Sequence, residues 1–215
     1  MKLILISQKS IKLIQIIVLV SLIIMMNACL VIRHEEEAEK PFVLNLSPLP
    51  ELEMSDIMIK SELGDIFAFI PENWFIVNLE GQAPSDVISV AVNPEYTISI
   101  VFSKIRKLDK YEEIVAREEL LGLARLSMEQ RVKKTAGAVK LTETYSTINM
   151  GPRRFAKYIF ANSDNSMMGI SAVFKSSIND YYEMTVLPIN LTGIEPVSRR
   201  ELEKVFNSVL TTVQY

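Results

Sequence analysis

The segment 64–75 constrains the fold most, because it joins two apolar runs through a turn and contains the only Trp of the 215 residues, Trp74. Its first run, residues 66–70, predicts a strand. Pro71 fixes φ at about −65°, which suits the second position of a turn. Asn73 tolerates the left-handed conformation that often closes one. We expect the chain to reverse here and Trp74 to anchor the core.

Apolar runs bounded by turn residues predict further strands along the chain. A hairpin should join residues 57–59 to the strand at 66–70. Sequential strands with short connections should then pair as an antiparallel meander. The strands expected after the Pro71 turn are 87–92, 96–105, 139–148, 154–161, 168–174 and 181–187.

Two segments have apolar residues at helical spacing. The first should begin at Asp109, with Glu112 completing a capping box, and end in a cluster of cations. Its predicted apolar stripe is Tyr111, Ile114, Leu121, Ala124, Met128 and Val132. The second helix should begin at the capping box Ser198–Glu201. We predict an α+β fold, an antiparallel sheet of about seven strands flanked by helices.

The order of these elements resembles the Mog1/PsbP/DcrB-like superfamily over roughly residues 55–215. The resemblance rests on the strand that ends in Pro71-x-x-Trp74, one long helix, antiparallel strands that close on residues 181–186, and a terminal amphipathic helix. It implies a sandwich of an antiparallel sheet and helices. Members of this superfamily have unrelated roles, so the resemblance by itself assigns no activity.

The amino terminus has the layout of an export signal. Three Lys precede the apolar run 13–26, and Cys29 follows the small residue Ala28 at the start of a polar stretch. We predict a lipoprotein-type signal peptide, residues 1–28, and lipidation of Cys29. Two alternatives stay open: a transmembrane anchor at residues 13–32, which is about the length that spans a bilayer, and a cleaved soluble protein.

The polar stretch after Cys29 is rich in charge and Pro and lacks periodicity. Residues 29–54 are therefore expected to be a flexible linker, and residues 55–215 the PsbP/DcrB-like domain. His34 lies beside three Glu, but consecutive side chains point in different directions, so no metal site is expected there.

Charge and cysteine content exclude two classes of property. Residues 1–28 contain three Lys and no acidic residue, so their removal changes the formal charge from −3 to −6. Such an acidic domain is a poor candidate for nucleic-acid binding. A single Cys excludes an internal disulfide.

No arrangement typical of an active site is found in the sequence. The only His is in the expected linker, so Ser/His/Asp and Cys/His nucleophile sites cannot form within the domain. The Gly residues are scattered singly, which argues against a phosphate-binding loop. Glu183 falls on the face opposite to Tyr182 and should be solvent-exposed or paired. We expect no catalytic, cofactor-binding or metal-binding residue, and hence no enzyme.

Two basic clusters, Arg131 with Lys133 and Lys134 and Arg153 with Arg154 and Lys157, are compatible with an acidic partner or with solvated element ends.

The sequence therefore favours a non-enzymatic lipoprotein of the bacterial cell envelope. Its anchor would hold it to the membrane, and its domain would act outside the cytoplasm as a binding or scaffold module for another envelope protein. The alternative is a carrier that holds an apolar small molecule or lipid between the sheet and the first helix. A deep apolar cleft beneath that helix would favour the carrier, and tight packing would favour the binding module.

Overall fold

The computed structural model describes residues 42–46, 49–79, 81, 83–107, 109–189 and 197–215. The expected signal peptide, Cys29 and His34 lie outside these residues. Within the described ranges, no helix has both the length and the apolar character that crossing a bilayer requires.

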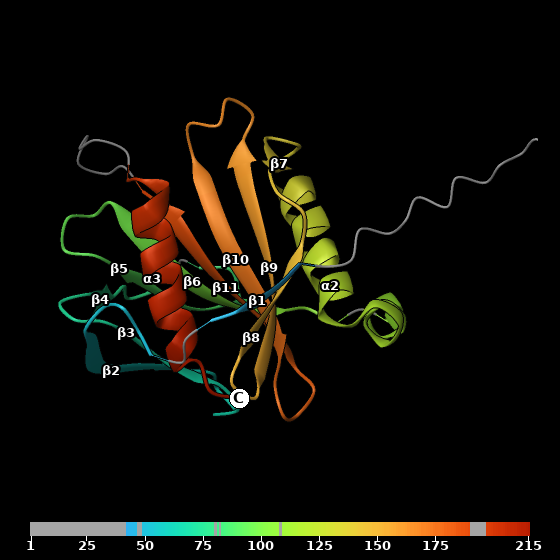
Figure 1. Ribbon diagram of the computed structural model, residues 1–215, viewed down its shortest axis with the longest axis horizontal. Helices are drawn as coiled ribbons and strands as arrows, with labels where there is room; N and C mark the ends of the chain where they lie inside the picture. Colours follow the sequence, from blue (N-terminus) through green and yellow to red (C-terminus); the bar gives the residue numbers. More distant parts are fainter. Residues whose placement is uncertain (1–41, 47–48, 80, 82, 108, 190–196) are drawn as a thin grey trace, which may run out of the picture. The chain divides into compact units, whose positions relative to one another are not determined.

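The described residues form a large sheet, a separate two-stranded sheet and two helices (Figure 1). Neighbouring strands of the large sheet pair in the order β1-β8-β9-β10-β11-β6-β5-β4, and β7 pairs with β9. The strands of the large sheet are β1 (Phe42–Asn45), β4 (Phe75–Ile76), β5 (Val87–Val92), β6 (Ile98–Ile105), β7 (Val139–Leu141), β8 (Ser146–Met150), β9 (Arg153–Asn162), β10 (Met168–Lys175) and β11 (Tyr181–Pro188). The small sheet pairs β2 (Met54–Lys60) with β3 (Phe67–Pro71).

The expected fold class is confirmed: the sheet is antiparallel except at one edge, and helices flank it. The described strands of the large sheet number nine instead of about seven. One reason is that the strand predicted at 139–148 is interrupted. Its two parts, β7 and β8, both pair with β9, and an irregularity between them breaks the run.

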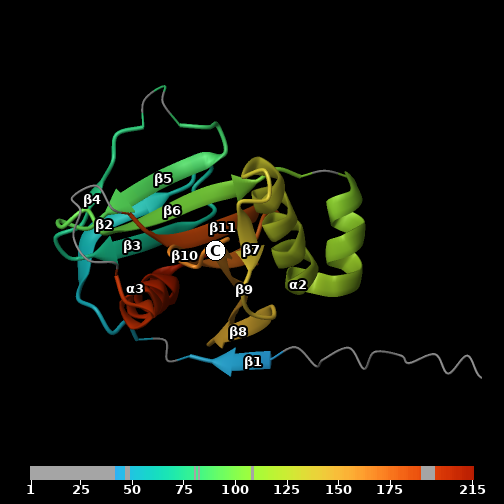
Figure 2. The same cartoon turned by 90° about the horizontal axis from the view of Figure 1, so that it is seen from above.

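The helices α2 (Asp109–Lys134) and α3 (Arg199–Thr212) cover opposite faces of the sheet (Figure 2). Side chains along β9 alternate between the two cores. Phe155 and Ile159 belong to the core that includes α3, and Ala156 and Tyr158 belong to the core that includes α2. This period of two is what a strand buried on both faces requires.

The turn at Pro71 forms as predicted. The Trp74 amide donates to the Pro71 carbonyl at 3.2 Å, and Asn73 has a φ of 65°. Trp74 is 8% exposed and belongs to the same core as the apolar side of α3. The second capping box is also confirmed, because the Ser198 hydroxyl accepts from the Glu201 amide and the Glu201 carboxylate accepts from the Ser198 amide.

Helix α2 differs from the single straight helix that the sequence predicted. Glu119, with φ 53° and ψ −142°, interrupts it, and the chain changes direction there (Figure 2). The six residues of the predicted stripe nevertheless lie in or against the core on this face: Tyr111, Ala124 and Met128 are buried, and Ile114, Leu121 and Val132 are partly buried. Beyond the bend, the buried face also carries Leu123, Leu126 and Ser127. The expected cap at Asp109 involves side chains that the structure does not describe.

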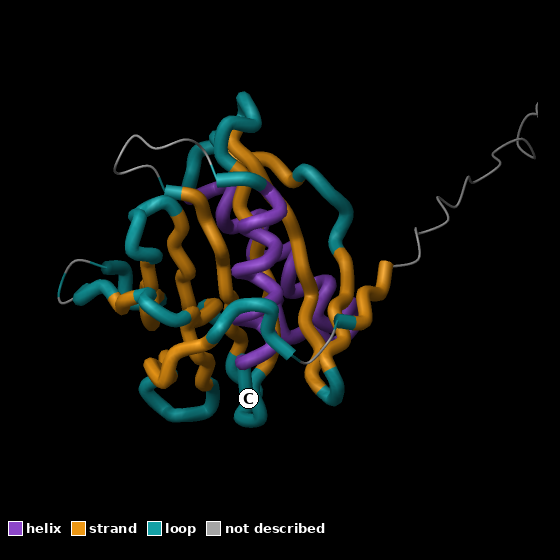
Figure 3. Tube along the Cα trace, turned by 60° about the vertical axis from the view of Figure 1, so that its left-hand side comes forward, coloured by secondary structure: helices purple, strands orange, loops and turns teal. Residues whose placement is uncertain are grey.

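The predicted flexible linker, residues 29–54, has to be corrected over its last part. Residues 42–45 form β1, which pairs in parallel with β8, and the Leu46 amide donates to the Asn149 carbonyl at 3.1 Å. The amides of Glu51 and Leu52 both donate to the Ser208 hydroxyl of α3 at 3.1 Å. Apolar side chains explain this order, because Leu44, Leu46 and Leu52 pack against the main core. Figure 3 shows β1 at the edge of the large sheet.

Candidate functional site

A cleft of about 270 Å³ lies on the α2 face of the sheet, where the last turns of α2 meet β6 and β11. Strand alternation places Val101, Ser103 and Ile105 of β6 on this face, next to Glu183 and Thr185 of β11. Further lining residues are Pro84, Asp86, Val87, Lys104, Arg106, Ser127, Gln130, Arg131, Lys134, Thr135 and Leu187. The cleft therefore combines charged, hydroxyl and apolar groups.

Glu183 is the buried acid of the cleft. Its side chain is 8% exposed, although it lies in the middle of a central strand. The Ser127 hydroxyl donates to its carboxylate at 2.7 Å, and the Tyr158 hydroxyl donates to the other carboxylate oxygen. Ser127 comes from α2 and Tyr158 from β9, two strands away from β11 in the sheet, so the fold brings hydrogen-bond donors to the carboxylate from two elements.

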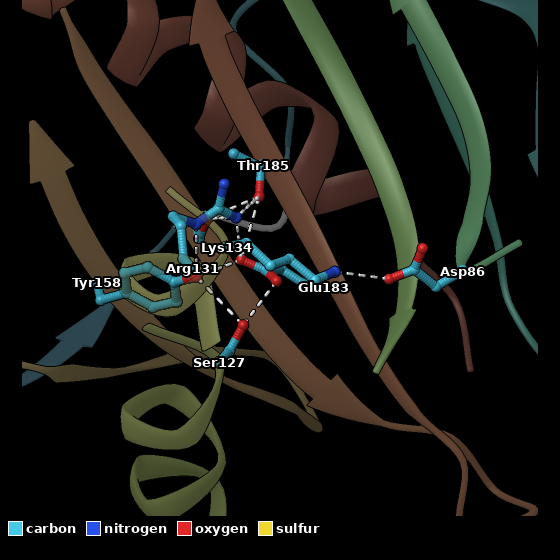
Figure 4. Close-up of polar contacts among 8 residues, drawn as sticks. Asp86, Ser127, Arg131, Lys134, Tyr158, Glu183 and Thr185 are labelled. Atoms are coloured by element: carbon cyan, nitrogen blue, oxygen red, sulfur yellow. Dashed lines mark hydrogen bonds and ion pairs between the residues drawn. The ribbon is translucent and has the colours of Figure 1, made fainter. Parts of the chain in front are cut away.

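Arg131 supplies the countercharge from the end of α2 (Figure 4). Its Nη2 donates to Glu183 at 2.7 Å and to the Thr185 hydroxyl at 3.1 Å, and its Nε donates to Tyr158 at 3.3 Å. The guanidinium also lies 4.3 Å from the ring centroid of Phe160. The Nη1 group makes no hydrogen bond within the described residues, and the Arg131 side chain keeps 23% of its surface exposed.

The environment fixes the charge states of these groups. Burial by itself would raise the pKa of the Glu183 carboxyl, but the Arg131 charge and the hydrogen bonds from Tyr158 and Ser127 lower it below its ordinary value. Burial raises the pKa of the Tyr158 hydroxyl, and the Glu183 charge adds to that effect. At neutral pH the cluster therefore holds a carboxylate, a guanidinium and a neutral phenol.

The mouth of the cleft carries a second, more exposed layer of charge. Lys134 Nζ lies 3.0 Å from an Asp86 carboxylate oxygen, which links the end of α2 to the start of β5 (Figure 4). Lys104 lies 2.6 Å from Asp180. Arg106 is exposed and makes no hydrogen bond or ion pair with the described residues.

The polar groups on the floor of the cleft are engaged with one another. The Ser127 hydroxyl donates a hydrogen bond to the Glu183 carboxylate, which also accepts one from Arg131. This carboxylate is therefore not a free base that could activate Ser127. The part of the chain that the structure describes contains no group of three His, Cys, Asp or Glu placed to hold a metal ion. A fixed guanidinium beside an apolar wall can instead orient a polar ligand.

The sequence located only part of this site. The sequence predicted that Glu183 is either solvent-exposed or paired. It is paired, and it is not exposed, because α2 covers it. Arg131 was interpreted as an ordinary cation at a helix end, whereas it is half-buried and pairs with Glu183. The signal that could have identified it is the i, i+4 spacing of Ser127 and Arg131 on the face that also contains Ala124.

The second basic cluster has structural contacts. Arg153 Nη1 donates hydrogen bonds to the carbonyls of Thr211 and Val213, at the carboxyl end of α3. Lys157 Nζ lies 5.9 Å from the centroid of the Phe206 ring. Burial lowers the pKa of the Lys157 ammonium, although the nearby carboxylates of Glu203 and Glu143 act to raise it. These residues therefore serve the contact between the sheet and α3.

Comparison with known proteins gives similarities to solved structures alone, since no family model and no curated protein matches the chain. One is the solution structure of cyanobacterial PsbP from Synechocystis sp. PCC 6803, with 12% identity, 74% of this chain and 91% of that chain covered, and a TM-score of 0.49. Another is a point mutant of Mog1, with 12% identity, 75% and 96% covered, and a TM-score of 0.47. Both names belong to the superfamily that the sequence resembles. With TM-scores below 0.5, neither similarity says anything about the activity, ligand or partner of this chain.

Proposed function

We propose that this protein is a membrane-anchored lipoprotein of the bacterial envelope whose domain binds another envelope component at the cleft between α2 and the sheet. The observation that carries the binding role is the ion pair of half-buried Arg131 with buried Glu183, which lies in the lining of a cleft that opens to solvent. A buried ion pair is a costly way to stabilise a fold, and apolar residues often serve as well. A polar floor is better explained by recognition of a polar ligand.

The packing of α2 favours a binding module over a carrier of apolar molecules. Leu123 and Ala124 are fully buried against the sheet, in the same core as Tyr158 and Phe160. The cleft that remains beside them is lined by six charged side chains. An acyl chain or a similar apolar ligand would leave these groups without water, which is unfavourable.

A non-catalytic role is supported by the same groups. The carboxylate of Glu183 accepts hydrogen bonds from four donors, the side chains of Ser127, Arg131, Tyr158 and Thr185, and is held ionised, so it is neither a strong base nor an acid at neutral pH. An enzyme needs a pKa closer to the working pH for proton transfer.

The binding role can be tested by cross-linking from inside the cleft. A photo-reactive amino acid placed at Gln130, a lining residue, should capture a defined envelope component in intact cells. The same amino acid at Lys204, an exposed position on α3, is the control. Equal labelling from both positions, or none from Gln130, would contradict the proposed envelope partner at the cleft.

The anchor is tested separately. The wild-type chain should sediment with membranes and carry lipid on Cys29, and Cys29→Ser should be released or remain as an uncleaved precursor. Intact-mass measurement of the wild-type chain distinguishes lipidated, cleaved and uncleaved forms. A wild-type mass that includes residues 1–28 and no lipid would favour the transmembrane alternative at residues 13–32.

A further inference from the structure

We propose that the cleft binds a small organic anion, with a carboxylate or phosphate group at the cationic mouth and a short apolar body against the wall of β5 and β6. This inference deepens the proposed function, since it names the chemistry of what the cleft would bind. It depends on three features of the cleft: its excess of cations, its partly apolar lining and its size.

The cations outnumber the acids in the lining. The lining contains Lys104, Arg106, Arg131 and Lys134 but only two carboxylates, those of Asp86 and Glu183, and a third carboxylate, Asp180, pairs with Lys104 from outside the lining. This surplus occurs in a chain whose formal charge is −3, so the cleft is a local exception to the charge of the protein. A concave surface with a charge of one sign concentrates ligands of the opposite sign.

Two of these cations have hydrogen-bonding capacity to spare. Glu183 and the neighbouring hydroxyls use the Nη2 and Nε of Arg131, but Nη1 has no partner among the described residues. Arg106 is exposed and has none within the same residues. Guanidinium groups donate charge-assisted hydrogen bonds to carboxylate and phosphate oxygens with favourable geometry. The charge of Glu183 holds Arg131 in place, so a ligand does not have to order this side chain.

Part of the lining is apolar. Pro84 lies in the loop before β5, Val87 is the first residue of β5, and Val101 and Ile105 line the cleft from β6. A ligand of inorganic phosphate alone would leave this wall uncovered. The volume of about 270 Å³ accommodates a small molecule, and it lies slightly below the usual range of about 300 to 1,000 Å³ for drug-sized ligands.

Asp86 modulates the charge at the mouth. Its carboxylate pairs with Lys134 at 3.0 Å, and the two side chains are 36% and 67% exposed. An incoming anion therefore competes with Asp86 for the Lys134 ammonium. Removal of the Asp86 charge should strengthen anion binding, and removal of the Lys134 charge should weaken it.

The test uses the full-length chain in a neutral maltoside detergent and follows backbone amide NMR signals. Hexanoate and hexyl phosphate are the anionic probes, and hexan-1-ol and hexylamine share the same apolar body. Both anions should shift signals of cleft residues such as Ser103 and Thr135, and the two controls should not. A preference for one anion would then identify the head group.

Charge variants sharpen the result. We expect Lys134→Gln and Arg106→Gln each to weaken hexanoate binding roughly two- to fivefold, the effect of one exposed charge, and Asp86→Asn to strengthen it by a similar factor. Lys133→Gln is the matched control, because Lys133 is the exposed neighbour of Lys134 and does not line the cleft. Equal responses of Lys133→Gln and Lys134→Gln, or equal binding of hexan-1-ol and hexanoate, would overturn the proposal.

The two proposals fail in different ways. If cross-linking from Gln130 captures an envelope protein and neither anion shifts the cleft signals, the anion proposal is wrong and the binding module stands. If the anions bind with the expected charge dependence but Gln130 captures nothing, the site binds a small molecule and the proposed protein partner is wrong.

Discussion

Arg131 Nη2 and Glu183 Oε1 are 2.7 Å apart, although the two residues lie 52 positions apart in the sequence and on different elements, α2 and β11. The pair fastens the end of α2 to the centre of the sheet. Because Ser127, one helical turn earlier, donates to the same carboxylate, the helix is held at two successive turns. Loss of either charge should therefore loosen the whole floor of the cleft.

We expect Glu183→Gln to lower the free energy of unfolding by about 3 kcal/mol at pH 7, near the lower end for breaking a buried pair, because Arg131 retains some exposure. Urea denaturation measures this change. Glu129→Gln, which removes an exposed carboxylate from α2, should change the stability by less than about 0.5 kcal/mol. Equal effects would show that the buried pair contributes nothing specific.

The same variant has a predictable pH dependence. The pKa of Glu183 is lower in the folded protein than its ordinary value of 4.5, so its contribution to stability is fully present above that value. It is lost as the pH falls through the folded-state pKa. The difference in stability between wild type and Glu183→Gln should therefore be constant from pH 7 to pH 5 and shrink below about pH 4.5. A difference that grows on acidification would contradict the assigned charge state.

Trp74 is the clearest test of the main core. Truncation to Ala should cost about 3 to 5 kcal/mol, the range for a buried aromatic residue, because Trp74 is only 8% exposed. Ile178→Ala, at a position that is 50% exposed, serves as the control and should be nearly neutral. An unchanged melting temperature for Trp74→Ala would remove this residue from the core.

Substitution of Glu119 is expected to increase the stability of the protein. Its φ of 53° with ψ of −142° is a conformation that residues other than Gly adopt at a cost of about 1 to 3 kcal/mol. We expect Glu119→Gly to stabilise the protein, even though Gly inside a regular helix is destabilising. The lost ion pair with Arg154 is exposed and should contribute little. If Glu119→Gly is less stable than Glu119→Ala in thermal denaturation, the bend is absent in solution.

The start of α3 provides a smaller effect. Ser198→Ala removes the hydroxyl that accepts from the Glu201 amide, and the loss should be about 1 kcal/mol. Ser198→Thr keeps a hydroxyl and should retain most of the stability. Amide hydrogen exchange at the first turn of α3 should increase in the Ala variant alone.

The sequence predicted elements with strong local signals and missed relationships that depend on distant residues. The Pro71 turn, the capping box at Ser198 and the strand at 181–187 were predicted because each is encoded within a few neighbouring residues. The bend at Glu119 was missed because that residue has no Gly or Pro beside it to signal a break. The cleft was missed because its floor joins Arg131 to Glu183, and spacing along one element does not reveal such a contact.

The same reasoning explains the misjudged linker. Its charge and Pro content indicated a solvated segment, yet Leu44 and Leu52 have partners on β8 and α3 that only the complete fold provides. Composition describes what a segment can do alone, and order here comes from a surface elsewhere in the chain.

The pairing of β1 with β8 has a consequence for the order of folding. Phe42 is paired with Ser146, so the first strand of the sheet has no partner until more than a hundred further residues have been made. Glu51 and Leu52 depend on Ser208, which is closer still to the carboxyl end. Contacts so distant in sequence form slowly. For a chain that emerges amino terminus first, we expect the segment 42–52 to remain unpaired and open to proteolysis until α3 docks.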